Sequence, residues 1–368
     1  MPDPRVQNLA KVLVHYSLDL TPGQRLYIIS TPLGAPLVRE VLRESLQAGI
    51  LTDVHLRLED DIELRLRHAT EDQLKDISPL RRLPVETYDG LLHIMAPENT
   101  RSLTGIDPQR NAIFGKAAGE LTRIITDRFA RGEMRWAVTQ YPTQSAAQDA
   151  EMSLAEYEDF VYRAGMLDRE DPVRLWRAEA ERQRKLIAWF AGKKSVHMSG
   201  PDVDLRLSIE ERTFIECAGR ENFPDGEIFA CPIEDSAEGW VRFAYPAVFS
   251  GNEVTDVEMR FEKGKAVAEK ASKGQEFLTA MLNMDEGSRH LGEWGIGTNY
   301  DILRFTREML FDEKIGGTIH LALGDGMPEA GGLNKSSLHW DMLCDMRQGE
   351  IIVDGEVVYR NGRFILDL

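Results

Sequence analysis

The sequence predicts an α/β domain over residues 1–193, an open sheet with flanking helices, followed by a mainly antiparallel β domain over residues 194–368. In the first part, short apolar runs alternate with longer segments of helical periodicity, which is the rhythm of an α/β layer structure. In the second part, polar and apolar residues alternate with a period of two between glycine-containing turns. A chain of 368 residues is long enough for two such domains.

The elements of the first domain follow from these patterns. "RLYIIS" at residues 25–30 predicts a strand, and "APLVREVLRESLQAGI" predicts a helix that stops near Gly49. The turn between them, "STPLGAP", lacks the spaced glycines that let a pyrophosphate approach the backbone, so no dinucleotide fingerprint is present. We expect nearly continuous helix over residues 144–193, and further strands at residues 53–58, 90–96 and 134–142.

The second domain alternates more regularly. "PDVDLRLSIEER" and "DVEMRFEKGK" each place apolar side chains on one face of a strand and polar ones on the other. A helix at about residues 274–283 interrupts the β pattern. These observations favour antiparallel strands that are each half buried.

Composition excludes several classes of function. The formal net charge of −17, from 61 acidic and 44 basic residues, would repel a nucleic acid backbone, so no nucleic acid partner is expected. Three cysteines without a CxxC spacing predict neither disulfides nor a thiolate zinc site, and they suit a cytoplasmic protein. No apolar stretch reaches the roughly 20 residues that cross a bilayer, so no membrane partner is expected. GxSxG, HExxH and Walker motifs are also absent.

Three residues in the last third predict half of a metal site. In "GTIHLALG" the alternation separates His320 from the apolar face of its strand. In "SSLHWDML" His339 and Asp341 are two residues apart, so both side chains leave the strand in one direction. Histidine and aspartate are ligands of divalent metals. The alternative is that these groups form the solvated polar face of an antiparallel sheet.

Two carboxylates stand out by their context. Glu227 in "NFPDGEIF" follows a Pro-Asp-Gly turn and begins a strand, where sites are commonly built. Glu293 in "HLGEWGIG" has glycine neighbours, which allow another element or a ligand to come close to the backbone. Either residue could instead be an exposed acid in a turn.

Several motifs in a fixed order resemble one family. "NFPDGEIF", "LGEWGIG", "HLALGDGMPEAGGLNKSSLHWDM" and "IIVDGEVVYRNGRF" resemble the metalloaminopeptidases of the aminopeptidase T and aminopeptidase S type. The resemblance covers nearly the whole chain and is strongest from about residue 221 onward. It implies a two-domain, homodimeric enzyme that uses two divalent metal ions. The ligands that it implies are Glu227, Glu293, His320, His339 and Asp341.

One position departs from the family pattern, because Met327 stands where the family often has tyrosine. Oxygen and imidazole ligands suit Zn, Co or Mn. Two such ions, the three carboxylates and one bridging hydroxide would form a neutral core, which tolerates partial burial.

We therefore expect a metallo-exopeptidase, a hydrolase that removes N-terminal residues from peptides with a water activated by two metals. Glu329, beside the expected site, is a candidate general base. One alternative is a mononuclear iron dioxygenase that opens dihydroxypyridine rings, with His320, His339 and Asp341 as a facial triad. Another is a metal-binding relative that has lost catalysis.

Overall fold

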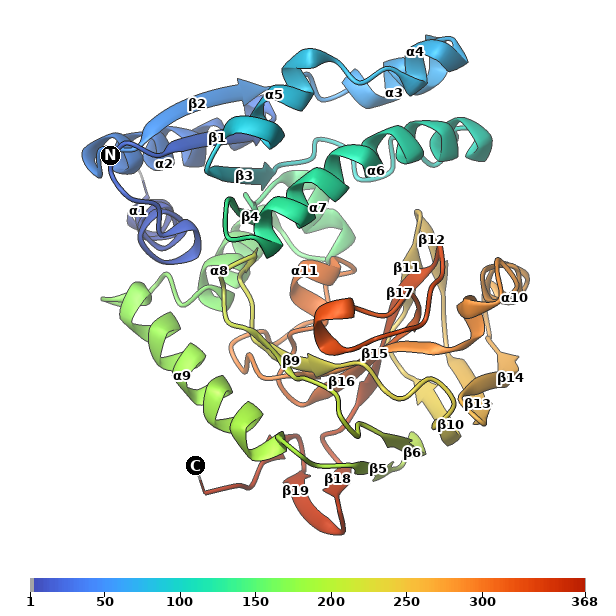
Figure 1. Ribbon diagram of the computed structural model, residues 1–368. Helices are drawn as coiled ribbons and strands as arrows, with labels where there is room; N and C mark the ends of the chain where they lie inside the picture. The colour runs from blue at the N-terminus through green and yellow to red at the C-terminus, as the bar shows by residue number, and fades with distance from the viewer. Residues whose placement is uncertain (1–2, 368) are drawn as a thin grey trace. The chain divides into compact units, whose positions relative to one another are not determined.

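The computed structural model describes residues 3–367, and the chain forms two compact units (Figure 1). Unit 1 comprises residues 1–176 with 219–224, and unit 2 comprises residues 177–218 with 225–368. Residues 219–224 thus belong to the first unit, although they come from the second half of the chain. The domain boundary expected between residues 193 and 194 stays a prediction. No described helix combines the length and the apolar character needed to span a membrane.

Unit 1 is built on a parallel five-stranded sheet with the order β2-β1-β3-β4-β8. The predicted strand at residues 25–30 is confirmed as β1, and the following helix ends before Gly49, which has a positive φ of 75°. The strands are β1 (Arg25–Ser30), β2 (Leu51–Leu56), β3 (Gly90–Met95), β4 (Arg135–Gln140) and β8 (Asn222–Phe223).

Helices connect these strands, as the α/β rhythm predicts. The segment expected to be nearly continuous helix is three helices, because non-helical residues interrupt it twice. The helices are α1 (Pro4–Val12), a π-helical turn (Leu13–Leu18), a 3₁₀ turn (Pro32–Gly34), α2 (Ala35–Gln47), α3 (Asp61–His68), α4 (Glu71–Lys75), α5 (Pro79–Thr87), α6 (Pro108–Ala130), α7 (Gln144–Asp149), α8 (Leu154–Ala164) and α9 (Pro172–Phe190).

Unit 2 contains two larger antiparallel sheets, which confirms the predicted fold class. The eight-stranded sheet has the order β14-β13-β10-β6-β5-β18-β19-β20. Its strands are β5 (Ser195–Gly200), β6 (Val203–Ser208), β10 (Glu238–Phe243), β13 (Val257–Glu262), β14 (Lys265–Lys270), β18 (Glu350–Val353), β19 (Glu356–Arg360) and β20 (Arg363–Phe364). The expected helix near residue 274 is α10 (Gln275–Leu282).

The five-stranded sheet of unit 2 has the order β17-β16-β15-β9-β7 and is antiparallel throughout. Its strands are β7 (Ile215–Cys217), β9 (Glu227–Ala230), β15 (Leu291–Gly297), β16 (Thr318–Gly324) and β17 (His339–Asp345). The remaining elements of unit 2 are most of helix α9 (from residue 177 onward), the hairpin β11 (Ala247–Phe249) and β12 (Asn252–Val254), helix α11 (Met309–Asp312), and 3₁₀ turns at Gly287–Arg289 and Pro328–Ala330.

One apolar core joins the two larger sheets of unit 2. Met198 and Leu205 of the eight-stranded sheet and Trp294 and Leu321 of the five-stranded sheet belong to one buried cluster. Because side chains alternate along a strand, the residues next to Trp294 and Leu321 leave from the opposite face of the five-stranded sheet. That opposite face carries the predicted metal ligands.

Candidate metal centre

Strand register brings the five predicted ligands together from four neighbouring strands. Glu227 begins β9, Glu293 is on β15, His320 is on β16, and His339 and Asp341 are on β17. Asp341 pairs with Ala322, which pairs in turn with Glu293. These positions lie across adjacent strands on one face, where side chains interact directly.

The first ligand group consists of Glu227, Glu293 and His320. His320 Nε2 lies 3.1 Å from Glu293 Oε1 and 3.2 Å from Glu227 Oε2. His320 is 0% exposed, and the two glutamates are 4% and 6% exposed. These three side chains each offer a ligand atom within 4.8 Å of the others, so one cation could contact all three.

The second ligand group consists of Glu293, His339 and Asp341. His339 Nε2 lies 3.7 Å from Glu293 Oε2 and 3.5 Å from Asp341 Oδ2. His339 Nδ1 lies 3.1 Å from the carbonyl oxygen of Asp325, which can accept only if Nδ1 carries the proton. That hydrogen bond leaves the Nε2 lone pair directed at the carboxylates, which is the usual arrangement of a metal-binding histidine.

Gly295 explains how the His320 ring reaches the two glutamates. Gly295 pairs with His320 across β15 and β16, and a Cβ atom at Gly295 would lie 2.0 Å from both Cε1 and Nε2 of that ring. The ring therefore lies across the glycine, in space that any larger side chain would fill. The expectation that the glycines around Glu293 permit close approach of another element is confirmed.

The electrostatics of the cluster show an excess of negative charge. Burial raises the pKa of Glu293, and the nearby Asp341 and Glu227 carboxylates add to this rise against the effect of His320. Burial alone would lower the pKa of His320, but Glu227 and Glu293 raise it to about 9. The buried atoms Glu227 Oε2 and Asp341 Oδ1 accept no hydrogen bond. Since buried charges need partners, this donor set fits divalent cations.

A buried lysine beside the first group was missed by the sequence analysis. Lys314 is 0% exposed, and its Nζ lies 3.2 Å from Glu227 Oε1 and 4.0 Å from Asp225 Oδ1. Burial lowers the pKa of Lys314, but Glu227 and Asp225 outweigh this and raise it. In "FDEKIGG" the lysine has acidic neighbours in sequence, which is typical of a solvated surface, so no local signal marks it.

The remaining predicted residues lie in the connection between β16 and β17. Glu329 is exposed in a 3₁₀ turn, and no ion pair between its carboxylate and the five ligands is found among the described residues. Met327 packs against an apolar cluster that includes Phe229 and Cys231, and its backbone nitrogen lies 3.2 Å from Cys231 Sγ. The Met327 thioether thus lies in an apolar environment, at the position where the resemblance implies a tyrosine. The role of Glu329 stays a prediction.

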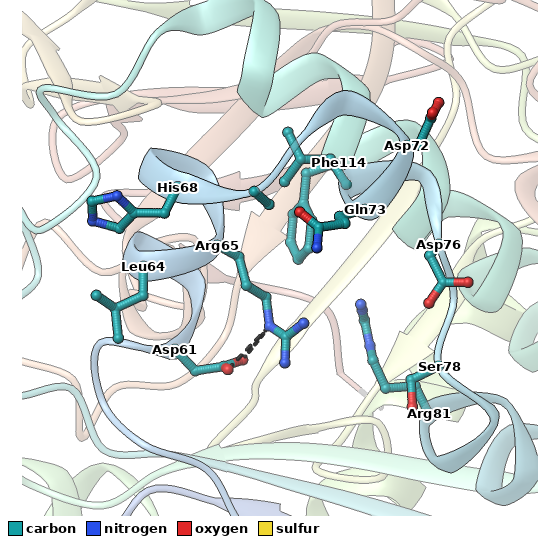
Figure 2. Close-up of a pocket in the computed structure, with 12 residues that line it drawn as sticks. Asp61, Leu64, Arg65, His68, Asp72, Gln73, Asp76, Ser78, Arg81 and Phe114 are labelled. Carbon is teal, nitrogen blue, oxygen red and sulfur yellow. Dashed lines mark hydrogen bonds and ion pairs between the residues drawn. The ribbon is translucent and has the colours of Figure 1, made fainter.

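Unit 1 contains a pocket of different chemistry, with a volume of about 740 Å³ (Figure 2). Its lining combines α3, α4 and the start of α5 with Phe114 of α6. Figure 2 shows Arg65 beside Asp61, and Arg65 Nε lies 3.0 Å from both carboxylate oxygens. The groups of metal-ligand type found in the described part of the chain all lie in unit 2, and none of their members lines this pocket.

Comparisons with known proteins agree with the donor set. A family model described as thermophilic metalloprotease (M29) matches residues 2–364. Aminopeptidase 2 of Geobacillus stearothermophilus is 24% identical, with 98% of this chain and 97% of the relative covered. Aminopeptidase T of Thermus thermophilus is 25% identical, with 97% and 95% covered.

A solved structure confirms the fold. The structure of wild-type AmpT from Thermus thermophilus matches with a TM-score of 0.84 and 22% identity, and the match covers 98% of this chain and 99% of that one. Antiparallel strands in unit 2, the clustered carboxylates and histidines, and a family match over nearly the full length lead to one conclusion. The chain belongs to the thermophilic metalloprotease family M29.

Proposed function

We propose that this protein is an aminopeptidase that removes N-terminal residues from peptides with a site for two divalent metal ions. The observation that carries the proposal is the position of Glu293. Its Oε1 faces His320 of the first ligand group, and its Oε2 faces His339 of the second. One carboxylate shared by two neighbouring ligand groups is the arrangement that a two-metal hydrolase needs.

Each group supplies oxygen and imidazole donors to one ion. Glu227 and His320 would hold the first ion, His339 and Asp341 would hold the second, and Glu293 would serve both. These donors suit Zn, Co or Mn. When bound, the ions would supply Lewis acidity toward the scissile carbonyl and lower the pKa of a water.

The chain's own residues define the rest of the chemistry. The three buried carboxylates offset the charge of the two ions, and the free amine of a peptide N-terminus would be a further ligand for one of them. We keep Glu329 as the candidate that transfers a proton, since it is in the connection between the ligand strands β16 and β17. The aminopeptidase names of the relatives support this choice of substrate.

The iron dioxygenase alternative has less support. A facial triad would require His320, His339 and Asp341 to face one ion, but the groups found among the described residues place His320 apart from the other two. Glu293 lies between the two sets, within 3.1 Å of His320 and 3.7 Å of His339. A mononuclear site formed by the first group would leave the carboxylate of Asp341 buried without a metal ion.

The decisive experiment combines metal analysis with an activity assay. We expect two divalent ions per chain and cleavage of leucine p-nitroanilide, and His339→Ala should abolish cleavage while the protein stays folded. His197→Ala is a matched control, because His197 lies on β5 and pairs with Asp204 at 2.8 Å, outside both ligand groups. One iron per chain with oxygen consumption would favour the dioxygenase. Two bound ions without turnover of any peptide would favour the relative that has lost catalysis.

We also propose a homodimer in the cytoplasm, on the basis of the family resemblance and the cysteine content. Strand β2 is at the edge of the parallel sheet, and Leu51, Val54 and Leu56 are between 38% and 47% exposed along it. An exposed apolar edge of this kind is suited to burial against a second copy. Light scattering on the purified protein would give the mass that tests this.

A further inference from the structure

Lys314 lies beside Glu227 of the first ligand group and is completely buried. It follows helix α11, and its neighbour Ile315 forms an isolated parallel bridge with Asn299. A Cβ atom at Gly297 would lie 2.1 Å from the carbonyl oxygen of Ile315, so the lysine segment packs directly on the end of β15. The strand that carries Glu293 therefore also fixes the backbone of Lys314.

The two oxygens of Glu227 have different environments. Oε1 lies 3.2 Å from Lys314 Nζ, whereas Oε2 lies 3.2 Å from His320 Nε2 and accepts no hydrogen bond. A charged contact on Oε1 holds the carboxylate plane and keeps that oxygen away from the ligand group. Only Oε2 is then directed toward a cation shared with His320 and Glu293.

A third group of ligand-type atoms lies on the far side of Glu227. It comprises Cys217, Asp225 and Glu227, with one atom of each within 4.8 Å of the others. Lys314 Nζ lies within 4.0 Å of both carboxylates of this group, and it also contacts Glu313. An ammonium group therefore already supplies the cation that these buried acids require.

The position of Asp225 is also fixed. Asn299 Nδ2 donates to the carbonyl oxygen of Asp225 at 2.8 Å, and the Gly226 nitrogen donates to the Cys217 carbonyl at 3.1 Å. A Cβ atom at Gly226 would lie 2.6 Å from Asn299 Cβ, so this turn tolerates no larger residue without a shift. The backbone around Asp225 is thus held in place beside the ammonium group of Lys314.

We propose that Lys314 is a positioning residue that takes the place of a third cation and restricts Glu227 to binding the first metal through Oε2 alone. This inference rests on the proposed two-metal function. Asp225 and Lys314 add one negative and one positive charge, so they leave the balance of the two ions, three carboxylates and hydroxide unchanged. The row of acids would then hold two metals and one fixed ammonium.

The test measures Zn²⁺ binding to the full chain after metal removal, by calorimetry, in two backgrounds. His339→Ala leaves the first ligand group complete, and His320→Ala leaves the second complete. Lys314→Met should weaken Zn²⁺ binding by roughly 10–100-fold in the His339→Ala background, as loss of a partner that orients a ligand does. In the His320→Ala background it should change binding by less than about threefold, since Lys314 does not contact the second group.

A matched control removes another cation of the same unit. Arg307 Nε lies 2.9 Å from Glu253, and the side chains are 22% and 20% exposed, so Arg307→Met breaks an ion pair away from the ligands. It should leave Zn²⁺ binding unchanged in both backgrounds. Equal weakening by Lys314→Met in the two backgrounds, or none in either, would show a merely structural lysine and overturn the inference.

Two further variants keep the inference testable if Lys314→Met does not fold. Lys314→Gln keeps a donor toward Glu227 without the charge, and it should weaken the first group less than methionine does but still selectively. In a Glu227→Gln background, where the carboxylate is gone, Lys314→Gln should have no further effect on Zn²⁺ binding. Absence of two Zn²⁺ sites in the unmutated protein would instead refute the proposed function, and this outcome is read before any variant is compared.

Discussion

Two histidines on interior strands of two different sheets experience opposite electrostatic environments. His93 is on β3 of the parallel sheet, where burial and the nearby Arg57 lower its pKa to about 4. His320 is on β16 of the antiparallel sheet, where Glu227 and Glu293 overcome burial and raise the pKa to about 9. The charges that the neighbouring strands supply therefore decide whether the surroundings of a histidine attract a cation. Burial alone does not decide this.

Strand register is the cause of the difference. Around His93, the paired positions are Ile29 on β1 and Val138 on β4, and Arg57 Nη2 lies 3.3 Å from His93 Nε2. Around His320, the paired Gly295 leaves space for the ring, and carboxylates from β9 and β15 converge on Nε2. In the parallel sheet, histidine therefore accepts a hydrogen bond from a guanidinium group. In the antiparallel sheet, it lies beside two carboxylates.

The largest expected effect follows from the removal of the His320 side chain. His320→Ala should lower kcat/KM for leucine p-nitroanilide by about 10³-fold or more, equivalent to about 4 kcal/mol, because it removes a ligand of the first metal. The metal content should fall from two ions to one. His93→Ala, which removes the half-buried histidine of the parallel sheet, should leave kcat/KM within about threefold. Comparable losses in both variants would mean that His320 acts only through the fold.

A smaller effect is expected from the glycine beneath the His320 ring. Gly295→Ala would place a Cβ atom 2.0 Å from the ring, so the imidazole must move, and the first metal should bind roughly 10–100-fold more weakly. Gly119→Ala is the matched control, since no atom lies within 4 Å of a Cβ at that position of α6. It should be neutral or stabilise the helix by about 0.5–1 kcal/mol. Zinc titration and thermal unfolding measure the two outcomes, and an unchanged zinc affinity in Gly295→Ala would contradict the packing argument.

The sequence predicts one face of the metal centre well, because strand alternation is a local property. The spacing of His339 and Asp341 places both on one side of β17, and the structure confirms this with 3.5 Å between His339 Nε2 and Asp341 Oδ2. The apolar face of β16 is likewise confirmed by Ile319 and Leu321, which are 0% exposed in the core. Periodicity alone is sufficient for such statements.

Pairing between distant strands is not encoded in any local pattern. Without the family resemblance, nothing in the sequence joins Glu227 to His320, and nothing identifies Lys314 as buried. The lysine is preceded by two acidic residues in sequence, and its partner Asp225 is 89 positions away. Its burial depends on how the segment after α11 packs on the end of β15, which only the tertiary structure shows.

A separate expected effect concerns stability at acid pH. The pKa of His93 in the folded protein is about 4, below its ordinary value of 6.5, so the unfolded chain binds more protons between these values. His93 therefore contributes stability that is present above about pH 6.5 and is lost as the pH falls toward 4. The loss for this residue should be about 3 kcal/mol, and His93→Gln should remove that part of the pH dependence in urea unfolding.

The contribution of Arg57 to this effect can be separated from burial. Arg57→Gln keeps an amide that can donate to His93 Nε2 but removes the positive charge, so the pKa of His93 should rise. It should stay below 6.5, because burial is the larger cause of the lowered value. Nitrogen-detected NMR titration of the histidine ring measures this directly. A pKa above 6.5 in this variant would mean that the guanidinium charge, rather than the apolar surroundings, separates His93 from His320.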